Sequence, residues 1–123
     1  MGPKKVLIVD DEAGVRAVLQ RLLALHGYQA DAVQDGGEAI DRLESGRYDL
    51  MIIDSSMPNI SGPEAISIIR SSPKFKGLKI VMFTGASKTG DVDEAFGLGV
   101  DGYLLKPMNV GRLLNAVSTA LAR

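Results

Sequence analysis

The chain has 123 residues, a length that fits one domain. Its hydrophobic content of 46% is ordinary for a globular protein, and its net charge of −1 gives no electrostatic case for binding nucleic acid or an anionic membrane surface. The absence of cysteine excludes disulfides, thiolate metal sites and cysteine nucleophiles. The sequence shows neither a signal peptide nor an apolar run that could span a bilayer, so we expect a cytoplasmic protein.

Short apolar segments rich in β-branched residues alternate along the chain with segments of helical periodicity. The segments predicted as strands are Lys5–Val9, Gln29–Val33, Leu50–Asp54, Lys79–Phe83 and Gly102–Leu105. The segments predicted as helices are Ala13–His26, Gly37–Glu44, Pro63–Ser71, Val92–Leu98 and a last helix capped by Asn109. The helix over 92–98 is the weakest, because Gly97 lies near its end and it has few apolar anchors.

The strict alternation of strand and helix predicts an α/β fold in a single domain over residues 1–123. Such a chain forms a parallel sheet with helices on both faces and right-handed crossovers. For five strands the common doubly wound order is 2-1-3-4-5, and the binding crevice lies where the first and third strands are neighbours.

Five polar residues follow or end the strands of this predicted sheet, and parallel strands bring them to one edge. They are Asp10 and Asp11, Asp54, Thr84 and Lys106. Carboxylates about 4 Å apart repel by on the order of 1 kcal/mol per pair in water, so a divalent cation explains their clustering best, and an all-oxygen site suits Mg²⁺. Lys106 and Thr84 offer a cation and a donor to an anion, and Asp54 is placed as a nucleophile that would form an aspartyl phosphate.

With these motifs the sequence resembles a response-regulator receiver domain along its whole length. The resemblance implies a flavodoxin-like fold. The resemblance rests on several motifs in the right order, each at the end of the right strand. The matching segments are Asp10-Asp11, Asp54-Ser55-Ser56-Met57-Pro58, Gly62, Thr84 and Tyr103-Leu104-Leu105-Lys106-Pro107. In the family the Lys-Pro bond of the last segment is usually cis.

The resemblance implies roles for the residues at the acidic edge. Asp54 would be the phosphoacceptor, and Lys106 would bind the phosphoryl group. Asp11, Asp54 and the carbonyl oxygen of Ser56 would hold Mg²⁺, with Asp10 acting through water.

The resemblance also implies a switch and partners. Thr84 would bind the phosphoryl group, and Tyr103 would be the aromatic switch residue that turns inward when Thr84 moves. The signal would be read on the face made by helix 92–98, strand 102–105 and the last helix. A histidine kinase or histidine phosphotransfer protein would supply the phosphoryl group, and a downstream target protein or output domain would receive the signal, without direct contact to nucleic acid or membrane.

Two small residues are expected to tune the lifetime of the phosphoryl group. Ser56 lies two positions after Asp54, and Ala86 lies two positions after Thr84. Neither can shield the phosphorus from water, and neither carries a carboxylate or amide that would orient the water. The sequence therefore predicts an intermediate lifetime.

Two other functions are possible for a chain with this fold. A pseudo-receiver, a protein-binding module of the same fold that is never phosphorylated, is disfavoured by the complete set of site residues. A phosphatase with an aspartyl intermediate usually needs a second Asp two positions after the nucleophile, where this chain has Ser56. Both a complete single-domain regulator and a receiver from a longer protein fit the sequence.

Overall fold

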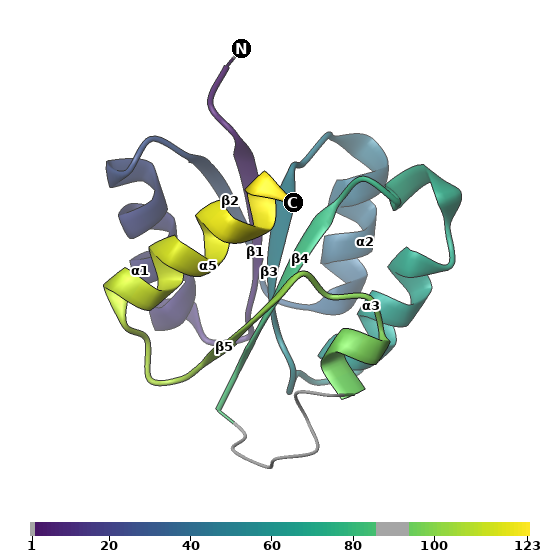
Figure 1. Cartoon of the computed structure of the whole chain (residues 1–123). Coiled ribbons are helices and arrows are strands. Elements are labelled where there is room, and N and C mark those ends of the chain that lie inside the picture. The colour runs from purple at the N-terminus through teal and green to yellow at the C-terminus, as the bar shows by residue number, and fades with distance from the viewer. Residues whose placement is uncertain (1, 86–93) are drawn as a thin grey trace.

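The structure, a computed structural model, describes residues 2–85 and 94–123. The strands are β1 Lys5–Val9, β2 Gln29–Val33, β3 Leu50–Asp54, β4 Lys79–Thr84 and β5 Gly102–Leu105. The helices are α1 Ala13–Leu25, α2 Gly36–Ser45, α3 Gly62–Arg70 and α5 Val110–Ala122, with a short 3₁₀ helix η1 at Pro73–Phe75. Residues 94–97 are also helical. Strands and helices therefore alternate along the chain (Figure 1).

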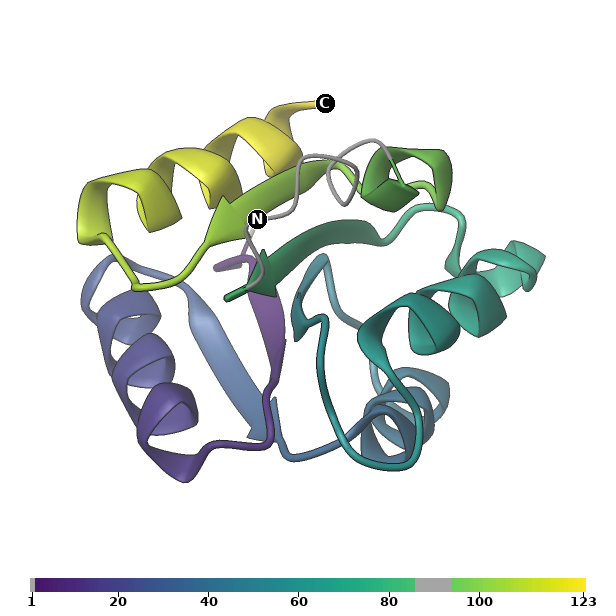
Figure 2. The ribbon, with the colours of Figure 1, turned by 90° about the horizontal axis from the view of Figure 1, so that it is seen from below.

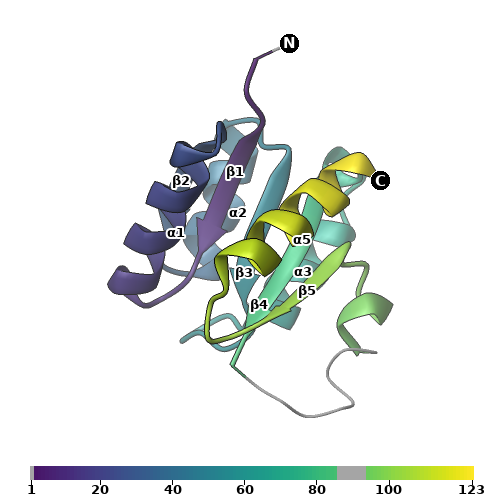
Figure 3. The same cartoon turned by 60° about the vertical axis from the view of Figure 1, so that its left-hand side comes forward.

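The five strands form one parallel sheet in the order β2-β1-β3-β4-β5, which confirms the predicted fold. Helices α1 and α5 cover one face of the sheet, and α2 and α3 cover the other, as the view from below shows (Figure 2). In Figure 3, α1 and α5 lie in front of the sheet. The central strand β3 is thus covered on both faces, and all five of its residues are buried.

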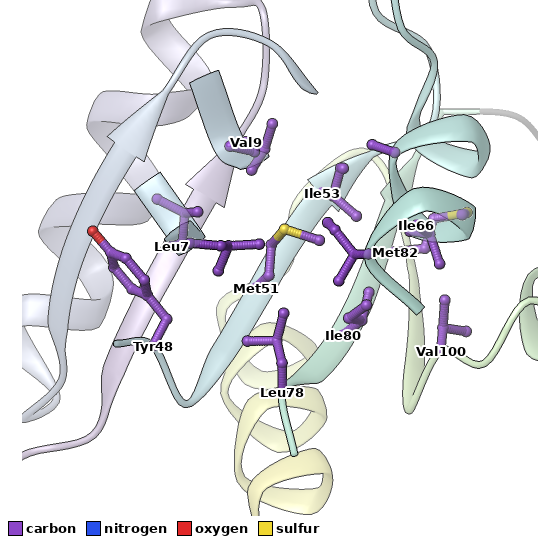
Figure 4. Packing of buried hydrophobic residues seen from close by; sticks show 14 of the residues in the cluster. Leu7, Val9, Tyr48, Met51, Ile53, Ile66, Leu78, Ile80, Met82 and Val100 are labelled. Atoms are coloured by element: carbon purple, nitrogen blue, oxygen red, sulfur yellow. The ribbon is translucent and has the colours of Figure 1, made fainter. Parts of the chain in front are cut away.

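Side chains alternate along each strand between two hydrophobic clusters, one on each face of the sheet. In β3, Met51 and Ile53 join the cluster beneath α2 and α3, whereas Leu50 and Ile52 join the one beneath α1 and α5. Figure 4 shows the first cluster, where Met51 from β3 lies between Leu7 of β1 and Ile80 of β4.

The predicted helix starts have the expected caps. Ser61 and Glu64 form a reciprocal capping box at α3, and the side chain of Asp35 accepts a hydrogen bond of 2.8 Å from the backbone N–H of Glu38 at α2. Asn109 caps α5. Predicted and observed ends of α1, α2, α3 and β4 differ by one residue, as is usual at frayed termini.

The predicted helix over 92–98 is described only in part, because residues 92 and 93 lie outside the described residues while 94–97 are helical. Among helices in the described part of the chain, none has the length and apolar character that crossing a membrane requires.

Candidate functional site

The polar residues singled out in the sequence meet at the carboxyl edge of the sheet, the lower edge in Figure 1. Asp10 follows β1, Asp54 ends β3, Thr84 ends β4 and Lys106 follows β5. Because β1 pairs with β3, β3 with β4 and β4 with β5 in parallel, all four strands end on the same side. The sheet topology therefore assembles the site from residues far apart in the sequence.

Lys106 is the cationic centre of this edge. Its Nζ lies 3.1 Å from Oδ2 of Asp10, 3.5 Å from Oδ2 of Asp54 and 3.7 Å from Oε1 of Glu12. The backbone N–H of Lys106 donates a hydrogen bond of 2.8 Å to the carbonyl oxygen of Thr84, and the following peptide bond, to Pro107, is cis. The lysine is thus fixed by its backbone at the end of β5 while its side chain reaches across to β1 and β3.

The environment of Asp54 works against its ionisation. Burial raises the pKa of this carboxyl above its usual value of 3.8, and the negative charge of Asp10 raises it further. The backbone N–H of Ser56, 3.3 Å from Oδ1 of Asp54, and the charge of Lys106 lower the pKa and offset part of that effect.

The environment of Lys106, unlike that of Asp54, favours the charged form of the side chain. Burial lowers the pKa of Lys106, but the hydrogen bond to Asp10 and the charges of Asp10 and Asp54 outweigh burial, so the pKa is raised overall. The ammonium group therefore stays charged between two buried carboxylates, which are 1% and 5% exposed for Asp10 and Asp54.

Asp10 and Asp11 have different environments although they are adjacent. Asp11 is exposed, whereas Asp10 is buried, with Oδ1 accepting a hydrogen bond of 2.9 Å from the backbone N–H of Glu12 and Oδ2 facing Lys106. Lys106 therefore compensates part of the negative charge of this acidic cluster, in addition to the charge that a divalent cation would supply.

Glu12 is a site residue to which the sequence assigned no role. One carboxylate oxygen from each of Asp10, Asp11 and Glu12 lies within 4.8 Å of the others. The sequence feature that could have identified Glu12 as a site residue is its position as the third acid in a run directly after a strand.

An open cleft of about 500 Å³ lies over this edge of the sheet. Its lining residues come from the ends of four segments and are Asp11, Glu12, Asp54, Ser55, Ser56, Thr84, Gly85 and Lys106. The carboxylates of Asp11 and Asp54 therefore face the same space as Ser56, and hard oxygen donors of this kind fit Mg²⁺. Asp10 is buried and is not among the residues that line the cleft.

The segment after Asp54 is held close to the start of α3. The backbone N–H of Gly62 donates a hydrogen bond of 3.1 Å to the carbonyl oxygen of Ser55. A Cβ atom at Gly62 would lie 2.3 Å from the carbonyl oxygen of Asp54 and 2.7 Å from Cα of Ser55. Glycine is therefore required for this approach, and α3 fixes the backbone of the candidate phosphoacceptor.

Thr84 and Tyr103 both line a second, smaller cavity of about 180 Å³, together with Met82 and Leu98. Thr84 is buried, Tyr103 is half-buried, and the hydroxyl of Ser55 is hydrogen-bonded to that of Thr84. Ser55 was not among the predicted site residues, since a serine in a loop carries no signal of its partner. Ala86 lies outside the described residues.

Comparison with known proteins identifies the family to which the chain belongs. The profile of the family described as "Response regulator receiver domain" matches residues 6–118. The chemotaxis protein CheY of Pseudomonas aeruginosa is 32% identical over 120 residues, 97% of each chain. The response regulator MprA of Mycolicibacterium vanbaalenii is 34% identical over 121 residues, 98% of this chain and 52% of MprA. The chain thus spans about half the length of the MprA relatives that it matches.

Solved structures give the same result. The chemotaxis response regulator CheY4 of Vibrio cholerae superposes with a TM-score of 0.90 at 30% identity, over 96% of this chain and 98% of that chain. A response regulator receiver protein from Pseudomonas putida superposes with a TM-score of 0.89 at 32% identity, over 96% and 98%. Because the family profile covers nearly the whole chain and the fold agrees with these relatives, the chain belongs to the family of response regulator receiver domains.

Proposed function

We propose that this receiver domain is a phosphorylation-activated switch that accepts a phosphoryl group on Asp54 from a histidine kinase or a histidine phosphotransfer protein in the cytoplasm. The observation that supports this most strongly is the pairing at the floor of the cleft. Asp54 is a buried carboxylate that opens onto the cleft, and the Nζ atom of Lys106 lies 3.5 Å from one of its oxygens. Nucleophile and charge-compensating cation are thus in place together.

The reaction is an in-line displacement at phosphorus. A carboxylate oxygen of Asp54 forms a bond to phosphorus while the bond from phosphorus to the donor nitrogen breaks, and the donor imidazole leaves with that electron pair. Lys106 compensates the negative charge on the phosphoryl oxygens, and the Thr84 hydroxyl donates a hydrogen bond to one of them. Both groups line the cleft around Asp54.

A divalent cation completes this proposal. Asp11, Asp54 and the carbonyl oxygen of Ser56 would hold Mg²⁺, and Asp10 would contribute through water. The bound ion would supply further positive charge next to the transferring group. The exposed carboxylate of Asp11 and the position of Ser56 in the same cleft support this ligand set.

Formation of a covalent adduct tests the proposal. The protein is incubated with Mg²⁺ and acetyl phosphate, and intact mass is recorded for wild type, Asp54→Asn and the matched control Asp41→Asn, whose carboxylate is exposed on α2. We expect one phosphoryl group on wild type and on Asp41→Asn, none on Asp54→Asn, and none on wild type in EDTA.

Two outcomes would contradict the proposal. An adduct on Asp54→Asn at the wild-type yield would remove Asp54 from the reaction. Absence of an adduct on wild type would favour the pseudo-receiver, a binding module that works without phosphorylation.

We further propose that the phosphorylated state is read on the face formed by residues 94–97, β5 and α5. Each of these segments exposes a large apolar side chain, namely Phe96 (45% exposed), Leu105 (47%) and Val110 (41%). Exposed apolar side chains favour contact with a partner protein where they form a continuous patch. Thr84 would move toward the phosphoryl oxygens, and Tyr103 would turn into the cavity that they share.

Hydrogen exchange tests this coupling. Beryllofluoride, a stable mimic of the phosphoryl group, is added in Mg²⁺, and amide exchange is compared with and without it. We expect changes near Asp54 and also across residues 94–105, because the switch links the two regions. Changes confined to the neighbourhood of Asp54 would refute the coupling.

A further inference from the structure

Two residues line both cavities at the carboxyl edge of the sheet. The outer cleft of about 500 Å³ contains Asp54 and Lys106, and the inner cavity of about 180 Å³ is bordered by Tyr103. Among the residues of the described structure, the linings of these two cavities share Ser55 and Thr84. Their hydroxyl groups are hydrogen-bonded to each other. This pair therefore forms part of the wall between the outer cleft and the inner cavity.

The backbones on both sides of this hydrogen bond are fixed. The carbonyl oxygen of Ser55 accepts the hydrogen bond of 3.1 Å from Gly62 at the start of α3. The carbonyl oxygen of Thr84 accepts one of 2.8 Å from Lys106, and Thr84 is paired with Leu105 in the sheet. With both backbones anchored, each hydroxyl changes position mainly by rotation about its side-chain torsion.

Each hydroxyl group of this pair can donate only one hydrogen bond, which limits how the two groups can be arranged. A hydroxyl has one hydrogen to donate and two lone pairs that accept. When Ser55 donates to Thr84, the oxygen of Thr84 acts as acceptor, and the hydrogen of Thr84 is directed to another acceptor. Hydrogen bonds in such a chain polarise and strengthen one another. A phosphoryl oxygen on Asp54 would be an acceptor on the cleft side.

We propose that Ser55 is a positioning residue for Thr84, whose hydroxyl it holds and orients so that Thr84 donates to the phosphoryl group. This inference rests on the proposed function, because it concerns how the same site binds that group. Ser55 acts only through Thr84. The hydrogen bond between the Ser55 and Thr84 hydroxyls would thereby connect the cleft that contains Asp54 with the smaller cavity that Tyr103 borders.

A double-mutant cycle tests the inference. The dissociation constant for beryllofluoride in Mg²⁺ is measured by amide NMR for wild type, Ser55→Ala, Thr84→Val and the double variant. Loss of one hydrogen bond between neutral groups predicts about fivefold weaker binding for Ser55→Ala. In the Thr84→Val background the same substitution should change binding by less than about 1.5-fold, because the hydroxyl it positions is absent.

Two further variants separate positioning from a general effect on the fold. Ser55→Thr retains the hydroxyl and should bind within about twofold of wild type. Ser67→Ala removes an exposed serine hydroxyl from α3 and should leave binding unchanged.

The outcomes are distinct from those that test the proposed function. If wild type fails to bind beryllofluoride, the proposed function fails. If wild type binds, the inference is overturned by an unchanged or tighter dissociation constant in Ser55→Ala, or by an equal loss in the presence and absence of the Thr84 hydroxyl. A loss that Ser55→Thr does not restore would also overturn it.

Discussion

The carboxylate of Asp54 is destabilised in the folded chain. The residue is only 5% exposed, and burial and the neighbouring charge of Asp10 raise its pKa above 3.8. The folded protein therefore holds a proton on this group more tightly than the unfolded chain does. The contribution of this carboxyl to stability is present below the unfolded pKa and is lost as the pH rises through the folded pKa.

This linkage makes Asp54→Asn a stabilising substitution at neutral pH. In EDTA at pH 7, we expect its free energy of unfolding to exceed that of wild type by about 1 kcal/mol, the size of a typical single substitution. The difference should shrink as the pH falls through the raised folded pKa of Asp54 toward its unfolded value. Urea unfolding across this pH range measures it, with Asp41→Asn as control. An Asp54→Asn variant that is less stable than wild type would contradict this account of the site.

Gly62 tests how closely α3 approaches the backbone of Asp54. A Cβ at this position would meet backbone atoms at 2.3 and 2.7 Å, and these cannot move aside as a flexible side chain could. We expect Gly62→Ala to lower the free energy of unfolding by about 1–3 kcal/mol, as overpacking does. Gly14 in α1 is the matched control, because a Cβ there would meet nothing within 4 Å.

The control substitution should have the opposite sign. Alanine is favoured over glycine in a helix interior by up to about 1 kcal/mol, and Gly14 lies in the first turn of α1, so Gly14→Ala should stabilise the protein by less than that amount. Thermal or urea unfolding of both variants gives the comparison. Equal effects of the two substitutions would show that the close approach at Gly62 is not a constraint.

At the scale of elements, Arg70 joins the end of α3 to the segment that leads into β5. Its Nε lies 2.9 Å from the carbonyl oxygen of Gly99, Nη1 lies 3.2 Å from that of Phe75, and Nη2 lies 3.1 Å from Oδ2 of Asp101. The same carboxylate oxygen accepts a hydrogen bond of 2.9 Å from the backbone N–H of Ile80 in β4. One guanidinium thus ties α3, η1 and the approach to β5 together.

Removal of this guanidinium should destabilise the fold, because its partners are only partly exposed and lose their hydrogen-bond donor. The side chains of Arg70 and Asp101 are 20% and 18% exposed. We expect Arg70→Ala to lower the free energy of unfolding by about 2 kcal/mol. Lys74→Ala, which breaks an exposed ion pair with Glu44, should change it by less than about 0.5 kcal/mol. Similar losses in the two variants, measured by urea unfolding, would contradict the role of Arg70.

At the scale of the whole molecule, the fold was predictable because hydrophobic patterning and turn residues agree along the chain. Apolar runs such as Leu50–Asp54 end on polar residues, and Ser61 and Asp35 signal helix starts, which leaves a doubly wound sheet as the simple solution. The helix over 92–98 was the weakest prediction because its sequence has few apolar residues at helical spacing.

The contacts within the site could be predicted only in part. Topology brings Asp54, Thr84 and Lys106 to one edge of the sheet. What the structure adds is that Asp10 is buried and paired with Lys106, and that the Ser55 hydroxyl reaches Thr84. These facts depend on side-chain direction and on burial by other elements, which no local pattern encodes.

The most direct test of the central claim is to identify the residue that carries the phosphoryl group. After reaction with acetyl phosphate in Mg²⁺, borohydride reduces an aspartyl phosphate to homoserine and marks the position permanently. Cleavage after Arg47 and Arg70 then releases one peptide that contains the acids Asp49, Asp54 and Glu64. Fragmentation of this peptide should place homoserine at position 54 in wild type and nowhere in Asp54→Asn. Homoserine at position 49, or an intact-mass adduct with position 54 unmodified, would contradict the assignment of Asp54 as phosphoacceptor.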